Sequence, residues 1–423
     1  MGTTDARRLA WTPAARPDWV TRINQEGRYF DLDSVVPLDE ASLLNAAREK
    51  TGLSDFGDHS DWYERFQVFI KSLREEADLN LMGRLMTRSD LVNILVARLE
   101  IEETYRQHPE IEDEEIVKPV MIVGQFRTGT SLLLNLLSLD QGNGSLRHWE
   151  CMYPCPPPEK ANYFSDPRIA KADHLVEQFN RVNPELIACH EFNALIPTEA
   201  SHAMILNFDG AWLVQMGSTP SHAASMQKRD TQPSLLYQKR LLKLLQWKNP
   251  NKHWILKSPD ALMYMPELLK VYPDMNFIWT HRDPLKAADS ITHFLCNYLW
   301  VRSDQTKVSG GIAERMLSAE FLSSALNPAI DWLETGVIPK ERVCNISFYD
   351  LEKSPVAEVE KVYRQFGMVF ADETRRIVSQ YMADNPRSAR PQPKYQPPEV
   401  GKASAERQAL KRYQDYFNVR SEY

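Results

Sequence analysis

The chain contains the stretch Gly124-Gln125-Phe126-Arg127-Thr128-Gly129-Thr130-Ser131 between two apolar runs, residues 120–123 and 132–139. The first run predicts a short buried strand, and the leucine-rich second run predicts a helix. Small residues between them allow the backbone to turn so that N–H groups point inward, and the helix start adds a positive dipole end. We therefore predict a strand, an anion-binding loop and a helix. An ordinary tight turn is the alternative.

The loop differs from the phosphate loop of nucleotide-triphosphate enzymes. That loop reads Gly-x4-Gly-Lys-[Ser/Thr], and its Lys and hydroxyl serve the outer phosphates and magnesium. Here Thr130 stands at the Lys position, and the cation lies inside the loop as Arg127. Thr130 and Ser131 add two hydroxyl groups. The loop therefore favours a phosphate-linked anion that needs no magnesium.

Two more predicted strands, 253–257 and 276–281, end at basic residues. Ligands of open α/β sheets bind beyond the carboxyl ends of the strands. Arg127, Lys257 and Arg282 are therefore expected to converge on one site, although they are far apart in the sequence.

A helix is expected to start at Pro284, because a proline at the first helical position loses no hydrogen bond. Ser290 then lies about two turns beyond Arg282. Arg282 and Ser290 can bind one phosphate together, although Ser290 can also bond back to its own helix and Arg282 to an acid such as Asp283.

With these motifs, the chain resembles the sulfotransferases that use 3′-phosphoadenosine 5′-phosphosulfate (PAPS). The resemblance is to the bacterial type with an Arg in the phosphosulfate loop, similar in plan to tyrosylprotein and heparan sulfotransferases, and it covers about residues 119–381. It implies that Arg282 and Ser290 hold the 3′-phosphate of the donor and that Lys257 donates to its bridging oxygen. It also implies that the 5′-phosphosulfate is held by Arg127, Thr128, Gly129, Thr130 and Ser131.

Sulfuryl transfer is an in-line displacement in which negative charge builds on the leaving phosphate, so positioned cations such as Arg127 and Lys257 favour it. The acceptor hydroxyl must also lose a proton. We predict Glu150 as the base, because tyrosylprotein sulfotransferases carry their catalytic Glu at the corresponding place. A salt-bridged Glu150 without catalytic role is the alternative, and the rival bases are Glu199, His202, Glu191 and His190.

Short apolar strands alternate with helices from Val117 onward, which indicates a parallel sheet. Further helices are expected at 166–181, 234–247 and 404–417, and a late edge strand at 342–347. The earlier part of the chain predicts helices at 40–50, 60–75 and 80–108, then an acidic loop at 110–115. The predicted fold is thus α/β, a P-loop-like parallel sheet flanked by helices, with an all-helical N-terminal region. The predicted divisions are a helical region covering the acceptor cleft (1–115), a PAPS-binding core (116–383), and a Pro-rich basic loop with a C-terminal helix (384–423).

Composition favours a globular enzyme, with 43% apolar and 25% charged residues. The net charge of −7 argues against a nucleic-acid partner, which would demand an extended basic face. No apolar run of about 18 residues predicts a membrane span, and no secretory signal precedes the fold, so a cytoplasmic location is expected. Five cysteines form neither a disulfide framework nor a metal pattern, and no metal is predicted: Cys151, Cys155, Cys189, Cys296 and Cys344.

The acceptor is expected to be a small, apolar hydroxyl compound, because two segments rich in aromatic residues suit an apolar pocket. Core burial explains the same aromatic residues almost as well: Phe208, Trp212, Phe294, Tyr298 and Trp300. The segment at 348–351 resembles a family segment that usually begins with Tyr, but here it begins with Phe348. In the family a basic loop covers the nucleotide, and its counterparts here would be Arg387, Arg390 and Lys394. The identity of the acceptor and the oligomeric state stay open, as do two other functions: a nucleotide-triphosphate enzyme or a non-catalytic nucleotide-binding protein on the same fold.

Overall fold

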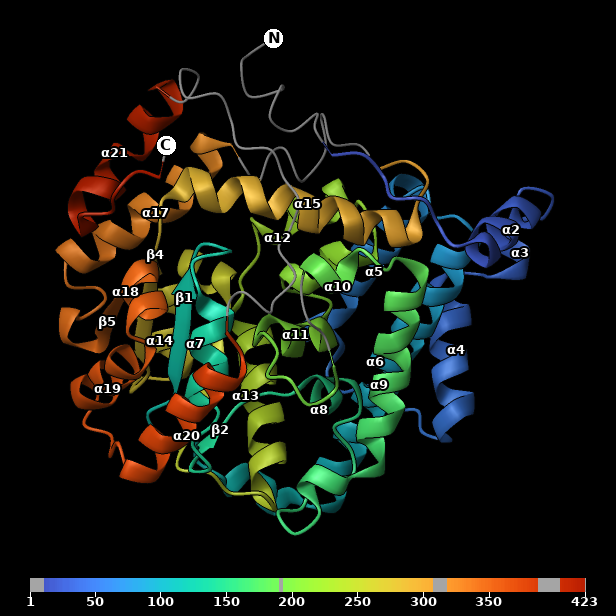
Figure 1. Ribbon diagram of the computed structural model, residues 1–423. Coiled ribbons are helices and arrows are strands. Elements are labelled where there is room, and N and C mark those ends of the chain that lie inside the picture. The colour runs from blue at the N-terminus through green and yellow to red at the C-terminus, as the bar shows by residue number, and fades with distance from the viewer. Residues whose placement is uncertain (1–10, 190–192, 307–317, 387–403, 423) are drawn as a thin grey trace.

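The computed structural model describes residues 11–189, 193–306, 318–386 and 404–422, without the side chains of 188–189, 288–293 and 404–405. Its centre is a five-stranded sheet in the order β2-β3-β1-β4-β5 (Figure 1). Every neighbouring pair in this sheet is parallel, and β1 pairs with β4 from Val120↔Asn276 to Gly124↔Thr280. The predicted parallel sheet is confirmed. Its strands are β1 (Val120–Gly124), β2 (Asn143–Gly144), β3 (His253–Lys257), β4 (Asn276–His281) and β5 (Val343–Ser347).

Both faces of the sheet are buried, as the continuous apolar strands require. Successive side chains of β1 point to opposite faces, so Val120 and Ile122 pack in one apolar cluster while Met121 and Val123 pack in the other. The first face is covered by α7 (Thr130–Leu137), α18 (Phe348–Lys353), α19 (Pro355–Gln365) and α20 (Asp372–Asp384). The second is covered by α13 (Gln232–Trp247), α14 (Met265–Val271), α17 (Ala319–Glu334) and α21 (Ser404–Phe417).

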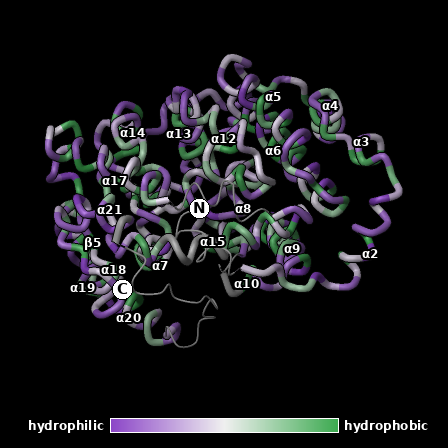
Figure 2. The backbone as a smooth tube through the Cα atoms, turned by 90° about the horizontal axis from the view of Figure 1, so that it is seen from above, coloured by the Kyte–Doolittle hydropathy of each residue, from purple (hydrophilic) through white to green (hydrophobic). Residues whose placement is uncertain are grey.

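The N-terminal region is helical, as predicted. Capping residues mark both ends of α4 (Glu40–Thr51): the Asp39 carboxylate accepts from the Ser42 N–H at 2.9 Å at its start, and Gly52 ends it at a φ of 71°. Its helices are α2 (Asp18–Gly27), α3 (Leu32–Val35), α4 (Glu40–Thr51), α5 (His59–Glu76) and α6 (Leu81–Gln107). In Figures 1 and 2, these helices lie on the side of the molecule opposite to α18, α19 and α20.

The N-terminal helices share one buried apolar cluster with the sheet. Leu43 of α4, Phe66 of α5 and Leu95 of α6 belong to the same cluster as Met121 and Phe277 of the central strands. Burial of apolar surface is the main stabilising term in folding, so this continuity ties the helical region to the sheet. The proposed boundary near residue 116 stays a prediction.

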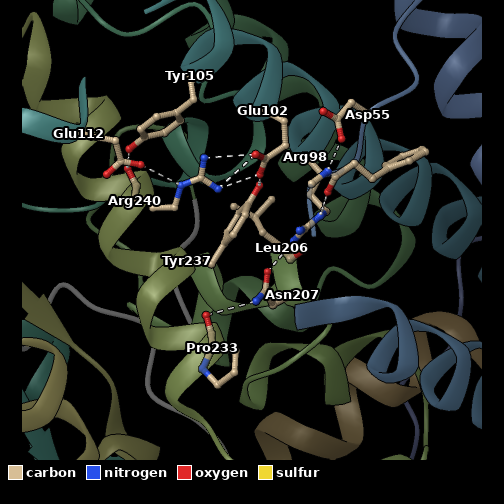
Figure 3. A network of polar contacts seen from close by, with 12 residues as sticks. Asp55, Arg98, Glu102, Tyr105, Glu112, Leu206, Asn207, Pro233, Tyr237 and Arg240 are labelled. Atoms are coloured by element: carbon tan, nitrogen blue, oxygen red, sulfur yellow. Dashed lines mark hydrogen bonds and ion pairs between the residues drawn. The ribbon is translucent and has the colours of Figure 1, made fainter. Parts of the chain in front are cut away.

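A polar network reinforces this connection between α6 and α13 (Figure 3). Arg240 of α13 forms a two-pronged ion pair with Glu102 of α6, and the Tyr237 hydroxyl donates to the same carboxylate at 2.9 Å. Arg98, which is 1% exposed, donates to the carbonyls of Phe56 and Leu206. Each buried polar group in the network thus has a partner, as burial requires.

The acidic segment predicted as a solvated loop is instead η1, a 3₁₀ helix at Pro109–Asp113. Glu112 contacts Arg240 at 3.5 Å and Lys243 at 3.3 Å, so part of its charge is neutralised by α13. The segment is nevertheless solvated as predicted, since the side chains of Glu110 and Glu112 are each 52% exposed.

The segments between the strands are mostly short helices. The predicted helix at 166–181 is confirmed as α9 (Pro167–Val182), with Asp166 as its N-cap. The others are α8 (His148–Met152), η2 (Tyr163–Ser165), α10 (Leu186–Cys189), α11 (Ser201–Met204), η3 (Ile205–Asn207), η4 (Ala211–Met216), α12 (Pro220–Met226), η5 (Pro259–Met263), α15 (Pro284–Arg302) and η6 (Lys340–Arg342). Within the described ranges, no helix has the length and apolar character needed to cross a membrane.

Candidate active site

The predicted anion-binding loop follows β1 directly. At Gly124 a Cβ atom would lie 2.5 Å from the Thr280 hydroxyl and 2.7 Å from the Thr280 carbonyl, so the close approach of β4 requires glycine. Arg127 and Gly129 adopt positive φ values of 68° and 93°, which turn the loop toward the start of α7. No side chain caps this helix start, which suits the binding of an anion by its N–H groups.

Thr128 holds the loop in shape. Its hydroxyl donates to the Gln125 carbonyl at 2.6 Å and lies 2.6 Å from the Thr280 hydroxyl of β4. The side chain is fully buried. The Thr128 hydroxyl therefore bonds only within the protein. Any contact of Thr128 with the expected donor would come from its backbone N–H group.

Lys257 ends β3 and points at the loop. Its ammonium group lies 3.3 Å from the Ser131 hydroxyl and 2.6 Å from Oε1 of Glu199. The Glu199 segment is fixed at the same place, because the Ala200 N–H donates to the Lys257 carbonyl at 2.7 Å. Lys257 is 3% exposed, and a buried ammonium group needs such an anionic partner. Lys257 is therefore a buried cation directed at the loop and not a surface charge.

Arg282 follows β4 and contacts the loop from the other side. Its Nη1 donates to the Arg127 carbonyl at 3.0 Å, and its guanidinium carbon lies 4.0 Å from the centre of the Phe348 ring. Phe348 thus packs against Arg282 by cation–π contact where the family usually has Tyr. Neighbouring Asp283 does not pair with Arg282: it caps α15 and accepts two hydrogen bonds of 2.7 Å from Arg407.

The structure therefore brings together the ends of three segments that the sequence singled out. Lys257 and Arg282 both contact the loop 127–131, as expected for the carboxyl ends of adjacent parallel strands. Ser290 belongs to α15, but its side chain lies outside the described residues. The same holds for further expected residues: His190, Glu191, Arg387, Arg390 and Lys394.

Glu150, the predicted base, lies in a different environment. It belongs to α8 and is 1% exposed. Its Oε2 accepts from the Arg147 N–H at 2.8 Å and its Oε1 from the Tyr163 hydroxyl at 2.9 Å. Burial raises the pKa of Glu150 to about 7. Oε2 thus caps the start of α8, and Oε1 connects α8 to η2.

A cavity of about 100 Å³ lies among α6, α8, α9 and the short helices α11, η3 and η4. His148, Cys151 and Met152 line it from α8, at the i, i+3 and i+4 positions of one helix face, so Glu150 points away from it. Its lining side chains are mainly apolar. The remainder comes from Asp90, Asn93, Ile94, Leu175, Val176, Phe179, His202, Ile205, Trp212, Gln215, Met216 and Arg302.

One wall of this cavity is a stack of rings. His202 lies parallel to Trp212 with a centroid distance of 4.3 Å, and His148 packs 4.7 Å from His202. Burial lowers the pKa of His148 to about 4 and holds the pKa of His202 well below its usual value. Both rings are therefore neutral at physiological pH. His202 lies one helical turn from Glu199, since its N–H donates to the Glu199 carbonyl at 2.9 Å.

Of the five aromatic residues considered for the acceptor pocket, Trp212 lines this cavity. Phe208 instead packs between Trp62 and Phe66, at centroid distances of 5.9 and 4.7 Å. The other three pack elsewhere in the interior: Phe294, Tyr298 and Trp300. An apolar pattern in the sequence does not distinguish a pocket wall from a core, because both bury the same side chains.

Two residues near Arg282 were not anticipated. Glu422 accepts from Arg282 at 2.7 and 3.1 Å, and Arg407 pairs with Asp283. Both come from the C-terminal part of the chain, and no local pattern links them to β4. Among the described side chains no group of three or more His, Cys, Asp or Glu is arranged to hold a metal ion, and the metal-free site stays a prediction. Four cysteines are free, and the side chain of Cys189 is not described: Cys151, Cys155, Cys296 and Cys344.

Residues 119–372, more than half of the chain, match the model of the sulfotransferase family. The chain belongs to this family, and the resemblance seen in its motifs is confirmed. The matched residues contain all five strands, the loop after β1 and the basic ends of β3 and β4.

Among individual proteins, the chain is similar to omega-hydroxy-beta-dihydromenaquinone-9 sulfotransferase Stf3 of Mycobacterium bovis. The two are 23% identical over 283 residues, which cover 63% of this chain and 67% of that protein. The solved structure of sulfotransferase STF9 from Mycobacterium avium superposes with a TM-score of 0.78 at 24% identity, over 90% of this chain and 97% of that one. Sulfotransferase STF1 from Mycobacterium tuberculosis H37Rv gives 0.72 at 24% identity, over 89% and 98%. The fold is therefore that of sulfotransferases.

Proposed function

We propose that this sulfotransferase moves the sulfuryl group of PAPS to the hydroxyl of a small, apolar acceptor by in-line displacement. The observation on which this depends most is the position of Lys257. Its ammonium group lies between the loop hydroxyl of Ser131 and the carboxylate of Glu199. A cation is thus held beside the loop that is proposed to bind the phosphosulfate, and a carboxylate lies next to it.

The residues around the loop fit an anionic donor with two phosphate-bearing ends. The donor supplies the sulfuryl group and a phosphate leaving group. Gly124 leaves room for the turn, the uncapped start of α7 offers N–H groups, and Arg127 and Lys257 supply positive charge. Arg282 already binds a carboxylate in two-pronged fashion, the geometry that guanidinium also uses for phosphate. Ser290, two turns further along α15, is proposed to bind the same phosphate.

For the base we propose Glu199 in place of Glu150. The Glu199 side chain is 16% exposed and touches Lys257, whereas Glu150 is 1% exposed and bound to Arg147 and Tyr163. A base must reach the hydroxyl proton of the acceptor, so access favours Glu199. Lys257 has three N–H groups, so while one binds Glu199 the others can turn toward the leaving oxygen.

The cavity walled by His202 and Trp212 is the proposed binding site for the apolar part of the acceptor. It lies one helical turn from Glu199 and has mainly apolar walls with a few polar groups, as ligand pockets do. At about 100 Å³ it is smaller than the cavity of about 150 Å³ that holds benzene in a protein core. It therefore suits a branched chain end rather than a whole ring. The similar Stf3 carries the name of a menaquinone derivative with a hydroxyl group, which is consistent with an apolar alcohol.

Calorimetry with adenosine 3′,5′-bisphosphate in the presence of a chelator tests the donor. We expect binding without magnesium, and binding of ATP with magnesium instead would favour a nucleotide-triphosphate enzyme. Incubation with labelled PAPS and a series of alcohols then tests the transfer. If the bisphosphate binds but no alcohol is ever labelled, the non-catalytic alternative is favoured. The cytoplasmic location and the absence of a nucleic-acid partner stay predictions.

A further inference from the structure

The segment that follows α21, residues 418–422, ends on the cation proposed for the 3′-phosphate. Nε and Nη2 of Arg282 donate to Oε1 and Oε2 of Glu422 at 2.7 and 3.1 Å. Two parallel N–H···O bonds are the arrangement in which a guanidinium group binds carboxylate or phosphate. Glu422 therefore occupies an edge of the Arg282 guanidinium group that is suited to binding a phosphate.

The contact is built by several bonds besides the ion pair. The Glu422 N–H donates to Oδ2 of Asp283 at 2.6 Å, next to the pair of Asp283 with Arg407. The turn before it is fixed by Gln414, whose carbonyl accepts from the Val419 N–H at 2.8 Å. The carboxylate is thus brought to Arg282 by a segment with defined backbone contacts.

The helix before this segment is anchored beside β4. The ring of Phe417 stacks on His281 at 4.1 Å, and the Tyr413 hydroxyl lies 3.0 Å from Nδ1 of His281. Tyr413 is 1% exposed within the large apolar cluster. Figure 1 shows α21 packed beside α17. The segment 418–422 therefore starts from a fixed point close to Arg282.

The ion pair is partly buried. The side chains of Arg282 and Glu422 are 13% and 19% exposed. Burial raises the pKa of Glu422, but hydrogen bonds such as that from Arg282 outweigh it and hold the pKa below its usual value. The carboxylate is accordingly charged at neutral pH and competes as an anion.

We propose that Glu422 is an internal competitor of the donor: it occupies Arg282 in the donor-free protein and is displaced when a 3′-phosphate binds. This inference rests on the proposed function, in which Arg282 binds that phosphate. A phosphate monoester brings nearly two charges and three acceptor oxygens, and it therefore outcompetes one carboxylate. Displacement reduces the apparent affinity by the fraction of molecules in which Arg282 is already occupied.

The test is Glu422→Gln, which keeps the size of the side chain and removes its charge. We expect adenosine 3′,5′-bisphosphate to bind about 3- to 10-fold more tightly, the scale of a partly buried ion pair. Adenosine 5′-phosphate lacks the 3′-phosphate, and its affinity should not change. Asp415→Asn is the matched control, because it removes one charge from an exposed side chain of α21 that pairs with Lys411.

A second variant separates competition from a general effect on the fold. In an Arg282→Ala background, Glu422→Gln should no longer alter the affinity for the bisphosphate. If Glu422→Gln leaves that affinity unchanged or weakens it while the wild-type protein binds the bisphosphate, the inference is wrong and the proposed function stands. Equal tightening of both nucleotides would show a steric cover and would also overturn it. If the wild-type protein does not bind the bisphosphate at all, the proposed function fails and the inference fails with it.

Discussion

Glu199 and Glu150 differ in what their carboxylates contact, and this difference predicts different effects of the same substitution. Glu199→Gln should lower turnover by about 10²- to 10⁴-fold, the usual contribution of a general base, while nucleotide affinity changes little. Glu150→Gln should retain turnover, because its two partners can still bond to an amide. Transfer from labelled PAPS measures turnover, and calorimetry with the bisphosphate is the control. If Glu150→Gln lowers turnover and Glu199→Gln does not, Glu150 is the base instead of Glu199.

Glu150 should reveal its structural role in the pH dependence of stability. Its pKa is about 7 in the folded protein, above the ordinary 4.5. Between these values the folded protein holds the proton more firmly than the unfolded chain, so stability falls as pH rises through this window. Glu150→Gln removes this contribution. The melting temperature of the variant should therefore fall less than that of the wild type from about pH 5 to about pH 8. If the melting temperatures of both proteins fall equally between about pH 5 and about pH 8, this assignment is wrong.

At the scale of elements, Arg98 of α6 is the point where the network of Figure 3 is most sensitive. Its guanidinium group donates to two carbonyls, and to Oδ1 of Asn207 at 2.5 Å. Arg98→Met should lower the free energy of unfolding by about 3–5 kcal/mol, because these buried acceptors lose their partner. Denaturation in urea measures this change.

Arg106→Met provides the control on the same helix. Arg106 is 68% exposed and pairs with Glu103 on the same face of α6, so its replacement should change stability by less than about 0.5 kcal/mol. A similar small effect for Arg98→Met would show that the network is dispensable for joining α6 to α13.

Elements with a clear helical period or an apolar run, including the strands β1, β3, β4 and β5, could be predicted from sequence, and the shortest ones could not. The helix 80–108 has a helical apolar period and the Asn80 cap, and it is observed as α6 within one residue at each end. By contrast, α11 has four residues and β2 has two, too few for a period to show. The resemblance to tyrosylprotein sulfotransferases favoured Glu150, whereas no helical period marks the position of Glu199, which lies just before α11. Contacts such as Arg282 with Glu422 join segments 140 residues apart and have no local signal.

At the scale of the whole molecule, the shared apolar cluster predicts cooperative unfolding. Helices α4 to α6 and the sheet bury their side chains together, so one thermal transition is expected in calorimetry. The bisphosphate at about 100 times its dissociation constant should stabilise the folded state by about 2.7 kcal/mol and shift the entire transition upward. Adenosine serves as the control ligand. Two separate transitions, of which only one responds to the bisphosphate, would contradict a common core.

The proposed donor and acceptor sites lie in different parts of this molecule, since the loop follows β1 while the cavity lies among α6, α8 and α9. Met152 and Leu175 line the cavity without contributing to the loop or to the basic strand ends. Shortening these two side chains offers a route to redesign: bulkier alcohols would be admitted while the sulfuryl supply stays intact. Acceptor specificity can thus change through substitutions in this cavity alone, without changes to the residues that act on the donor.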